Sequence, residues 1–223
     1  MTRNAKWLIL GTLGATALAA SFMLLPRKAQ GVISGSQHDF SSNGWAQNEI
    51  CKPCHTPHFA NMTVPDAPLW NHSVTTATFT PYSSPTLNAN MGTGQPSGIS
   101  KLCLSCHDGT VALDSYGGTT GGTSGMISGM GLIGTDLRDD HPISFTYDAA
   151  LVTSDTMGGV AGLWDPTTKV VPDLNSETVD QVLLINHKVE CSSCHDVHNK
   201  YNQSKLVKIT NVGSKLCLTC HNK

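Results

Sequence analysis

The sequence is poor both in the residues that build a protein core and in those that charge a surface. Of its 223 residues, only 6% are aromatic, 39% are hydrophobic and 13% are charged. This small supply of apolar side chains argues against a domain held together by its own hydrophobic core alone. The low charge argues against an intrinsically disordered chain. A chain of this composition needs stabilisation from metals, cofactors, disulfides or partners.

Cysteine is absent from the first fifty residues, which excludes a lipid-modified cysteine at the start of an exported chain. Arg3 and Lys6 precede an uncharged, mainly apolar run over residues 7–25, which is the pattern of a secretory signal peptide. We therefore predict a signal peptide over residues 1–30. An uncleaved N-terminal anchor is the alternative, because a run of 19 residues is long enough to span a membrane. Both interpretations predict export.

Basic residues are scarce in most of the chain and gather at its end. Residues 31–187 hold 4 basic and 14 acidic side chains, whereas residues 188–223 hold 6 basic and 2 acidic ones. This pattern gives no indication of nucleic-acid binding. It predicts either an ordinary solvated surface or a basic tail that attracts the acidic body of another copy.

All eight cysteines occur in pairs, and a histidine follows every pair immediately. In an exported chain, Cys-x-x-Cys-His is the attachment signal for c-type haem. The two thiols bond to the vinyl groups of the porphyrin, and the histidine ligates the iron from the proximal side. We predict four covalently attached haem c groups. The first motif is Cys51, Cys54 and His55; the second is Cys103, Cys106 and His107; the third is Cys191, Cys194 and His195; the fourth is Cys217, Cys220 and His221.

Two other uses of paired cysteines are compatible with this spacing. Four pairs are enough for two four-cysteine zinc sites, and exported proteins often form disulfides. Neither use requires a histidine after every pair, and a disulfide across two residues is strained. The pattern therefore favours haem.

Six further histidines are available for the distal side of the four irons: His38, His58, His72, His141, His187 and His198. Methionine ligation is the alternative, through Met62, Met91, Met126, Met130 or Met157. Two histidines on each iron favour electron transfer at low potential and leave no open position for a substrate. We therefore predict an electron carrier and not an enzyme.

A repeat divides the chain into two similar halves. Residues 100–107 and 214–221 are nearly identical, and each follows a motif of the form Cys-His-x-x-His. His58 and His198 lie three residues after a proximal histidine, on the same face of a helical turn, so each is expected to ligate a different haem. Extending the repeat predicts that His198 binds the second haem and His58 the fourth haem of another copy. His38 and His141 are then expected at the first and third haems.

Regular structure is expected to be sparse. Short helical turns should carry the motifs, and seven glycines between Tyr116 and Gly131 predict a flexible loop. The predicted fold is mostly irregular coil with few short helices, a multihaem cytochrome c packed around four covalently bound haems. The haem domain is expected over residues 31–223, as two dihaem modules of about 31–120 and 132–223 joined by the glycine-rich loop.

Several segments together resemble a known family, namely residues 35–40, 51–58, 67–72, 102–110, 140–144 and 191–198. They are similar to multihaem cytochromes with doubled CxxCH motifs, in particular the extracellular tetrahaem filament cytochromes of metal-reducing bacteria. The resemblance implies a polymer whose haems form a continuous wire and in which a histidine of one subunit ligates a haem of the next. It favours His38, His58, His141 and His198 as distal ligands and leaves His72 and His187 as packing or surface residues.

The resemblance also implies the location and partners of the chain. We expect a secreted protein in an extracellular or cell-surface filament, with copies of itself, other redox proteins and extracellular electron acceptors as partners. Contact with the membrane is expected only through the export signal, and nucleic acid is not an expected partner. The alternatives are a monomeric periplasmic electron shuttle and, less favoured by the histidine count, a multihaem reductase.

Overall fold

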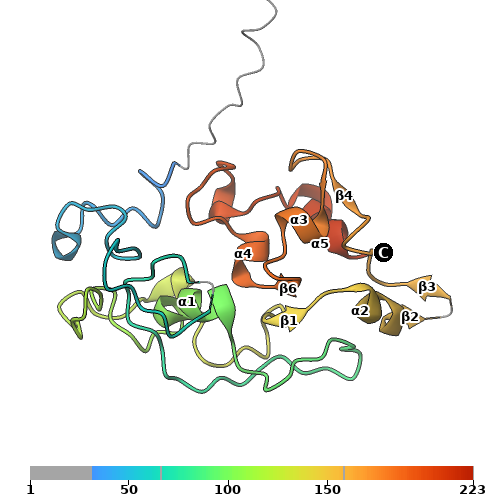
Figure 1. Cartoon of the computed structure of the whole chain (residues 1–223), viewed down its shortest axis with the longest axis horizontal. Coiled ribbons are helices and arrows are strands. Elements are labelled where there is room, and N and C mark those ends of the chain that lie inside the picture. The colour runs from blue at the N-terminus through green and yellow to red at the C-terminus, as the bar shows by residue number, and fades with distance from the viewer. Residues whose placement is uncertain (1–31, 66, 158, 223) are drawn as a thin grey trace, which may run out of the picture. The chain divides into compact units, whose positions relative to one another are not determined.

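The computed structural model describes residues 32–65, 67–157 and 159–222, which belong to one compact unit (Figure 1). The predicted signal peptide over residues 1–30 lies outside the described residues. Within the ranges given, no helix combines the length and hydropathy that a membrane span requires.

Most of the chain is coil, as the sequence predicts, and its helices and strands are short. The α-helices are α1 (Gly98–His107), α2 (Ala149–Ser154), α3 (Val179–Val182), α4 (Cys191–Cys194) and α5 (Lys215–Cys220). Short 3-10 turns are η2 (Gly44–Ala46), η3 (Gly129–Gly131), η4 (Ser204–Leu206) and η5 (Val212–Ser214). The strands are β1 (Phe145–Thr146), β2 (Thr156–Met157), β3 (Val160–Ala161), β4 (Val170–Val171), β5 (Glu177–Thr178) and β6 (Lys188–Val189).

The three sheets are antiparallel pairs of two residues each. β1 pairs with β6, β2 with β3, and β4 with β5. The first pair joins distant parts of the chain and aligns Phe145 with Val189, directly before the third motif. The pairing therefore fixes where α4 begins.

Helical turns carry all four motifs, which confirms the sequence prediction. The second, third and fourth motifs lie on α1, α4 and α5. The first motif forms a single turn, in which the His55 amide donates to the Cys51 carbonyl at 2.8 Å. A helical turn brings residues three apart to one face, so both cysteines of a pair point to the same side.

An apolar cluster packs around β1, β6, α2 and α3, which the sequence prediction of a fold packed around four haems did not include. Its buried members come from residues 145–209. A smaller cluster joins Phe79, Leu104 and Leu137 beside α1. Short strands and helices in residues 145–209 thus share one apolar centre of their own.

The glycine-rich loop is tied to one carboxylate. Asp114 accepts from the Thr123 hydroxyl, the Gly122 amide at 2.8 Å and the Ser124 hydroxyl at 2.7 Å. These bonds, led by that of the Thr123 side chain, hold the pKa of Asp114 well below its usual range. Gly121 has a φ of +62°, and a side chain there would meet the Ser115 amide nitrogen at 2.6 Å. The bonds give this segment a defined path back to α1.

Candidate haem sites

The eight cysteine thiols, all within the described residues, are free. The described part of the chain also holds no cluster of three or more Cys, His, Asp or Glu side chains suited to a metal ion. Neither the disulfides nor the four-cysteine zinc sites that the spacing allows are formed there. The thiols remain available for bonds to porphyrin vinyl groups.

A backbone carbonyl fixes the ring orientation of the proximal histidines His55, His107 and His195. The Nδ1 atom lies 2.6 Å from the Pro68 oxygen in His55, 2.6 Å from the Gly131 oxygen in His107 and 2.9 Å from the Lys205 oxygen in His195. A carbonyl only accepts, so the proton resides on Nδ1 and the lone pair on Nε2. This is the tautomer that metal-ligating histidines adopt, with Nδ1 held by a backbone partner. The residues therefore fit haem iron.

Three ring pairs each join a proximal histidine to a predicted distal one. His38 lies 5.9 Å from His107, measured between ring centroids. The same distance is 6.2 Å for His198 and His55, and 6.4 Å for His141 and His221. Two imidazoles that bind one metal from opposite sides, through bonds of about 2 Å, have centroids about 6 Å apart. All three pairs have the spacing of bis-histidine ligation.

This pairing differs from the one that the repeat predicts. His198 lies beside the first motif and not the second, His38 beside the second and not the first, and His141 beside the fourth and not the third. The repeat argument assumed that modules meet in chain order. Instead the segment after the third motif returns to the start of the domain, where the Asn199 side chain donates to the Val32 carbonyl at 3.4 Å.

His38 has the electrostatics of a ligand. Burial, followed by the charges of His107, His195 and His198, lowers its pKa to about 4. The ring is therefore neutral at pH 7, as iron ligation requires. Its buried Nδ1 has no hydrogen-bond partner among the described residues, which is costly for a polar atom.

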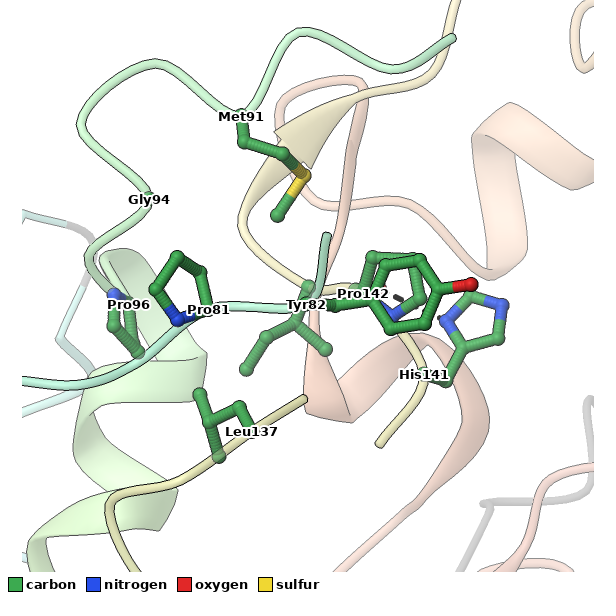
Figure 2. A pocket seen from close by; sticks show the side chains of 9 residues that line it. Pro81, Tyr82, Met91, Gly94, Pro96, Leu137, His141 and Pro142 are labelled. Atoms are coloured by element: carbon green, nitrogen blue, oxygen red, sulfur yellow. Dashed lines mark hydrogen bonds between the residues drawn. The ribbon is translucent and has the colours of Figure 1, made fainter. Parts of the chain in front are cut away.

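His141 lines an apolar hollow of nine residues, mostly proline, methionine and branched side chains (Figure 2). Its Nδ1 atom lies 2.8 Å from the Pro142 carbonyl, which leaves Nε2 free. Tyr82 and Pro142 stand beside the ring in Figure 2, and Met91 lies across the hollow. Met91, one of the methionines that are alternative iron ligands, thus lines the same hollow as His141, whose ring already pairs with that of His221.

Of the four proximal histidines and the four favoured distal ones, two remain apart from these pairs within the described residues. His195 of the third motif and His58 of the first motif's loop are exposed, and neither makes a ring contact with another histidine. Next to His58, the side chains of Phe59, Met62 and Leu69 are 104%, 76% and 54% exposed. Among the described residues, one proximal histidine thus has no distal histidine beside it, and one predicted distal histidine has no proximal histidine beside it.

The two histidines predicted to be non-ligating have other partners. Both nitrogens of His72 face carbonyl oxygens, Nδ1 that of Ser73 at 2.8 Å and Nε2 that of Ala112 at 3.0 Å. The Nδ1 atom of His187 lies 2.7 Å from an Asp180 carboxylate oxygen. These contacts support a packing role for His72 and a surface role for His187.

The motifs neighbour one another in chain order. Between the first two, the charge of Cys54 adds to burial in raising the pKa of the Cys106 thiol to about 12. Between the second and third, α1 packs on α4, and a hydrogen bond to Cys191, together with burial, raises the pKa of the Cys103 thiol. Burial and then the charges of Cys194 and Cys217 raise the pKa of Cys220 to about 12. Each motif therefore neighbours the next one along the chain, and we call the four in this order the row of motifs.

Sequence reasoning missed the groups that hold the proximal rings. Carbonyls occur at every residue, so nothing marks those of Pro68, Gly131 and Lys205 in advance. The buried Glu190 before the third motif was missed as well. The residues around Glu190 in the sequence do not indicate the contacts that its side chain makes with α1 and α4.

A family model of the doubled CXXCH motif matches residues 185–223, which contain the third and fourth motifs. No curated protein matches the chain. The family match and the free, paired thiols support a haem-binding electron-transfer protein of the multihaem c-type cytochrome kind, with covalently bound haem c.

We expect the protein purified from a host that matures c-type cytochromes to carry four haems per chain and no zinc. In the assembled form, all four irons should be low-spin, because six spare histidines serve four irons. Haem counting by mass spectrometry and electron paramagnetic resonance measure these properties. A count below four, or a substantial high-spin ferric signal in intact assemblies, would contradict the prediction.

Proposed function

We propose that this chain carries electrons along four bis-histidine c-type haems and polymerises head to tail into an extracellular filament. This is the organisation implied by its resemblance to the tetrahaem filament cytochrome OmcE. The observation that carries the proposal is the pair of unmatched histidines, His195 and His58. The other three proximal histidines already have a partner within the chain.

The unmatched pair points to a ligand shared between copies. His58 lies on an exposed turn with Phe59 and Met62, which suits a group that projects into another molecule. His195 is exposed and its Nδ1 is already held by the Lys205 carbonyl, so its iron would lack only the distal ligand. We therefore place the crossing bond between His58 of one copy and the third haem of the next, where the repeat argument predicted the fourth.

Such a contact joins two different surfaces of the same protein. A heterologous contact that does not close on itself generates a filament. The row of four motifs would then continue from one copy into the next, which is what conduction over many subunits requires. An extracellular location, with other redox proteins and extracellular acceptors at the filament ends, belongs to the same proposal.

The alternatives differ from the proposal in testable ways. A monomeric periplasmic shuttle would hold the same haems but would not self-associate. A reductase would keep one iron open for substrate, which His58 from a second copy would block. Electron microscopy of purified native material distinguishes them: filaments support the proposal, while particles of single-chain size that remain single at high concentration favour the shuttle.

The basic tail predicts a salt-dependent assembly rate. Lys208 donates to the Val182 carbonyl at 3.0 Å, and Lys215 pairs with Asp173 at 2.6 Å, so Lys205 is the exposed cation of the three whose side chain has no partner among the described residues. Lys205→Glu should slow assembly at low salt by severalfold and remove its salt dependence, since charges are screened beyond about 10 Å at 0.1 M. Light scattering follows the rate. Lys205→Arg is the matched control, and equal rates for both variants would show that charge does not guide assembly.

A further inference from the structure

A buried carboxylate lies at the junction of the second and third motifs. Glu190, the residue before Cys191, is 3% exposed. Its Oε2 atom accepts from the Ser100 amide and from the Ser144 hydroxyl, both at 3.1 Å. Its side chain also accepts from the Ser193 amide in a capping box that starts α4. Three donors from three segments therefore meet on one side chain.

The surrounding contacts place this carboxylate between two haem attachment points. Ser100 lies one turn before Cys103 on α1, and its hydroxyl accepts from the Cys191 amide at 2.9 Å. Figure 1 shows α1 and α4 side by side, in agreement with their packing contacts. Glu190 thus directly precedes Cys191 and accepts from a residue that lies one helical turn before Cys103.

No lysine, arginine or histidine in the described residues forms an ion pair with Glu190. A buried carboxylate without a cation is expensive unless hydrogen bonds or another positive charge stabilise it. The three donors supply part of that stabilisation. An oxidised bis-histidine haem carries a net positive charge at its iron, and the reduced one is neutral. A buried negative charge beside it favours the oxidised form, because charges interact more strongly away from water.

We propose that Glu190 lowers the reduction potentials of the second and third haems relative to the first and fourth. The proposal rests on the haem attachment proposed above. Reduction adds one electron from an upstream donor to each ferric iron, and no bond forms or breaks at Glu190. Glu190 acts as a positioning and electrostatic residue that makes the middle of the row harder to reduce than its ends.

Glu190→Gln tests the proposal, because glutamine keeps an oxygen acceptor for Ser100 and Ser144 but removes the charge. We expect two of the four midpoint potentials to rise and the other two to stay unchanged in a spectroelectrochemical titration. At a fixed potential, the reduced-to-oxidised ratio of the two haems should increase at least about tenfold, which corresponds to about 59 mV for one electron. Glu177→Gln, at an exposed position on β5, is the matched control and should move none of the four.

A second variant guards against a folding defect in the first. Ser144→Ala removes one donor from the carboxylate and should lower the same two potentials, a shift of opposite sign. Haem counting by mass separates the failures. An unsubstituted chain without attached haem contradicts the proposed function. Four attached haems with unmoved potentials in both variants overturn the role of Glu190.

Discussion

Replacing His58 with alanine should abolish filaments while leaving four haems attached to every chain. The attachment thiols and all four proximal histidines are untouched, and the His58 ring makes no ring contact with another histidine in the described residues. If His58 supplies the distal ligand of a neighbour's third haem, each joint loses a metal–ligand bond. We expect the association constant of each subunit contact to fall by at least about tenfold, which corresponds to a loss of about 1.4 kcal/mol per contact.

The spectroscopic consequence is equally specific. One iron in four should become high-spin or bind water, because the third haem would keep His195 as its only axial histidine. Electron microscopy and electron paramagnetic resonance on the same sample measure both effects. His187→Ala is the matched control, since His187 is also exposed but pairs with Asp180. A His58→Ala protein that still polymerises with every iron low-spin would contradict the shared ligand and favour the monomeric shuttle.

The local features of the sites could be predicted from the sequence because they depend on spacing alone. Two cysteines three apart and a following histidine specify a helical turn and a haem, and the turn is present even where no helix continues, at Cys51–His55. The coil-rich fold followed from the small apolar fraction. The ten-residue α1 is longer than the short helical turn that the sequence predicted, and its packing on α4 was not predicted.

The long-range pairings could not be predicted, because they depend on how coil segments cross. A histidine in coil carries no periodicity that points it toward a partner, and the repeat suggested a chain order that the fold does not follow. His198 reaches the first motif because its segment returns to Val32. His38 follows Val32 closely in the chain, so the same contact holds the segment of His38 where its ring meets that of His107 in the second motif. The apolar cluster around β1 and β6 likewise depends on pairing between residues more than forty positions apart.

Deleting the distal histidines one at a time should open one iron each, and a different iron in each variant. His38→Ala should convert the second haem to a high-spin or water-bound state, since His38 faces His107 at 5.9 Å. His198→Ala should do the same to the first haem and His141→Ala to the fourth. The effect is large because a low-spin iron loses one of its two strong axial ligands. Electron paramagnetic resonance quantifies the high-spin fraction, expected at about one haem in four for each variant.

The assignment of each histidine to its haem requires a second substitution. Cys103→Ser with Cys106→Ser removes the second haem, and mass spectrometry should then count three. On that background, His38→Ala should add no new high-spin signal, because the iron it served is gone, whereas His198→Ala should still add one. The order that the repeat predicts gives the reverse result, since His198 would then serve the missing haem and His38 the first. The same pair of variants therefore separates a ligand order set by the fold from one set by the order of the modules along the chain.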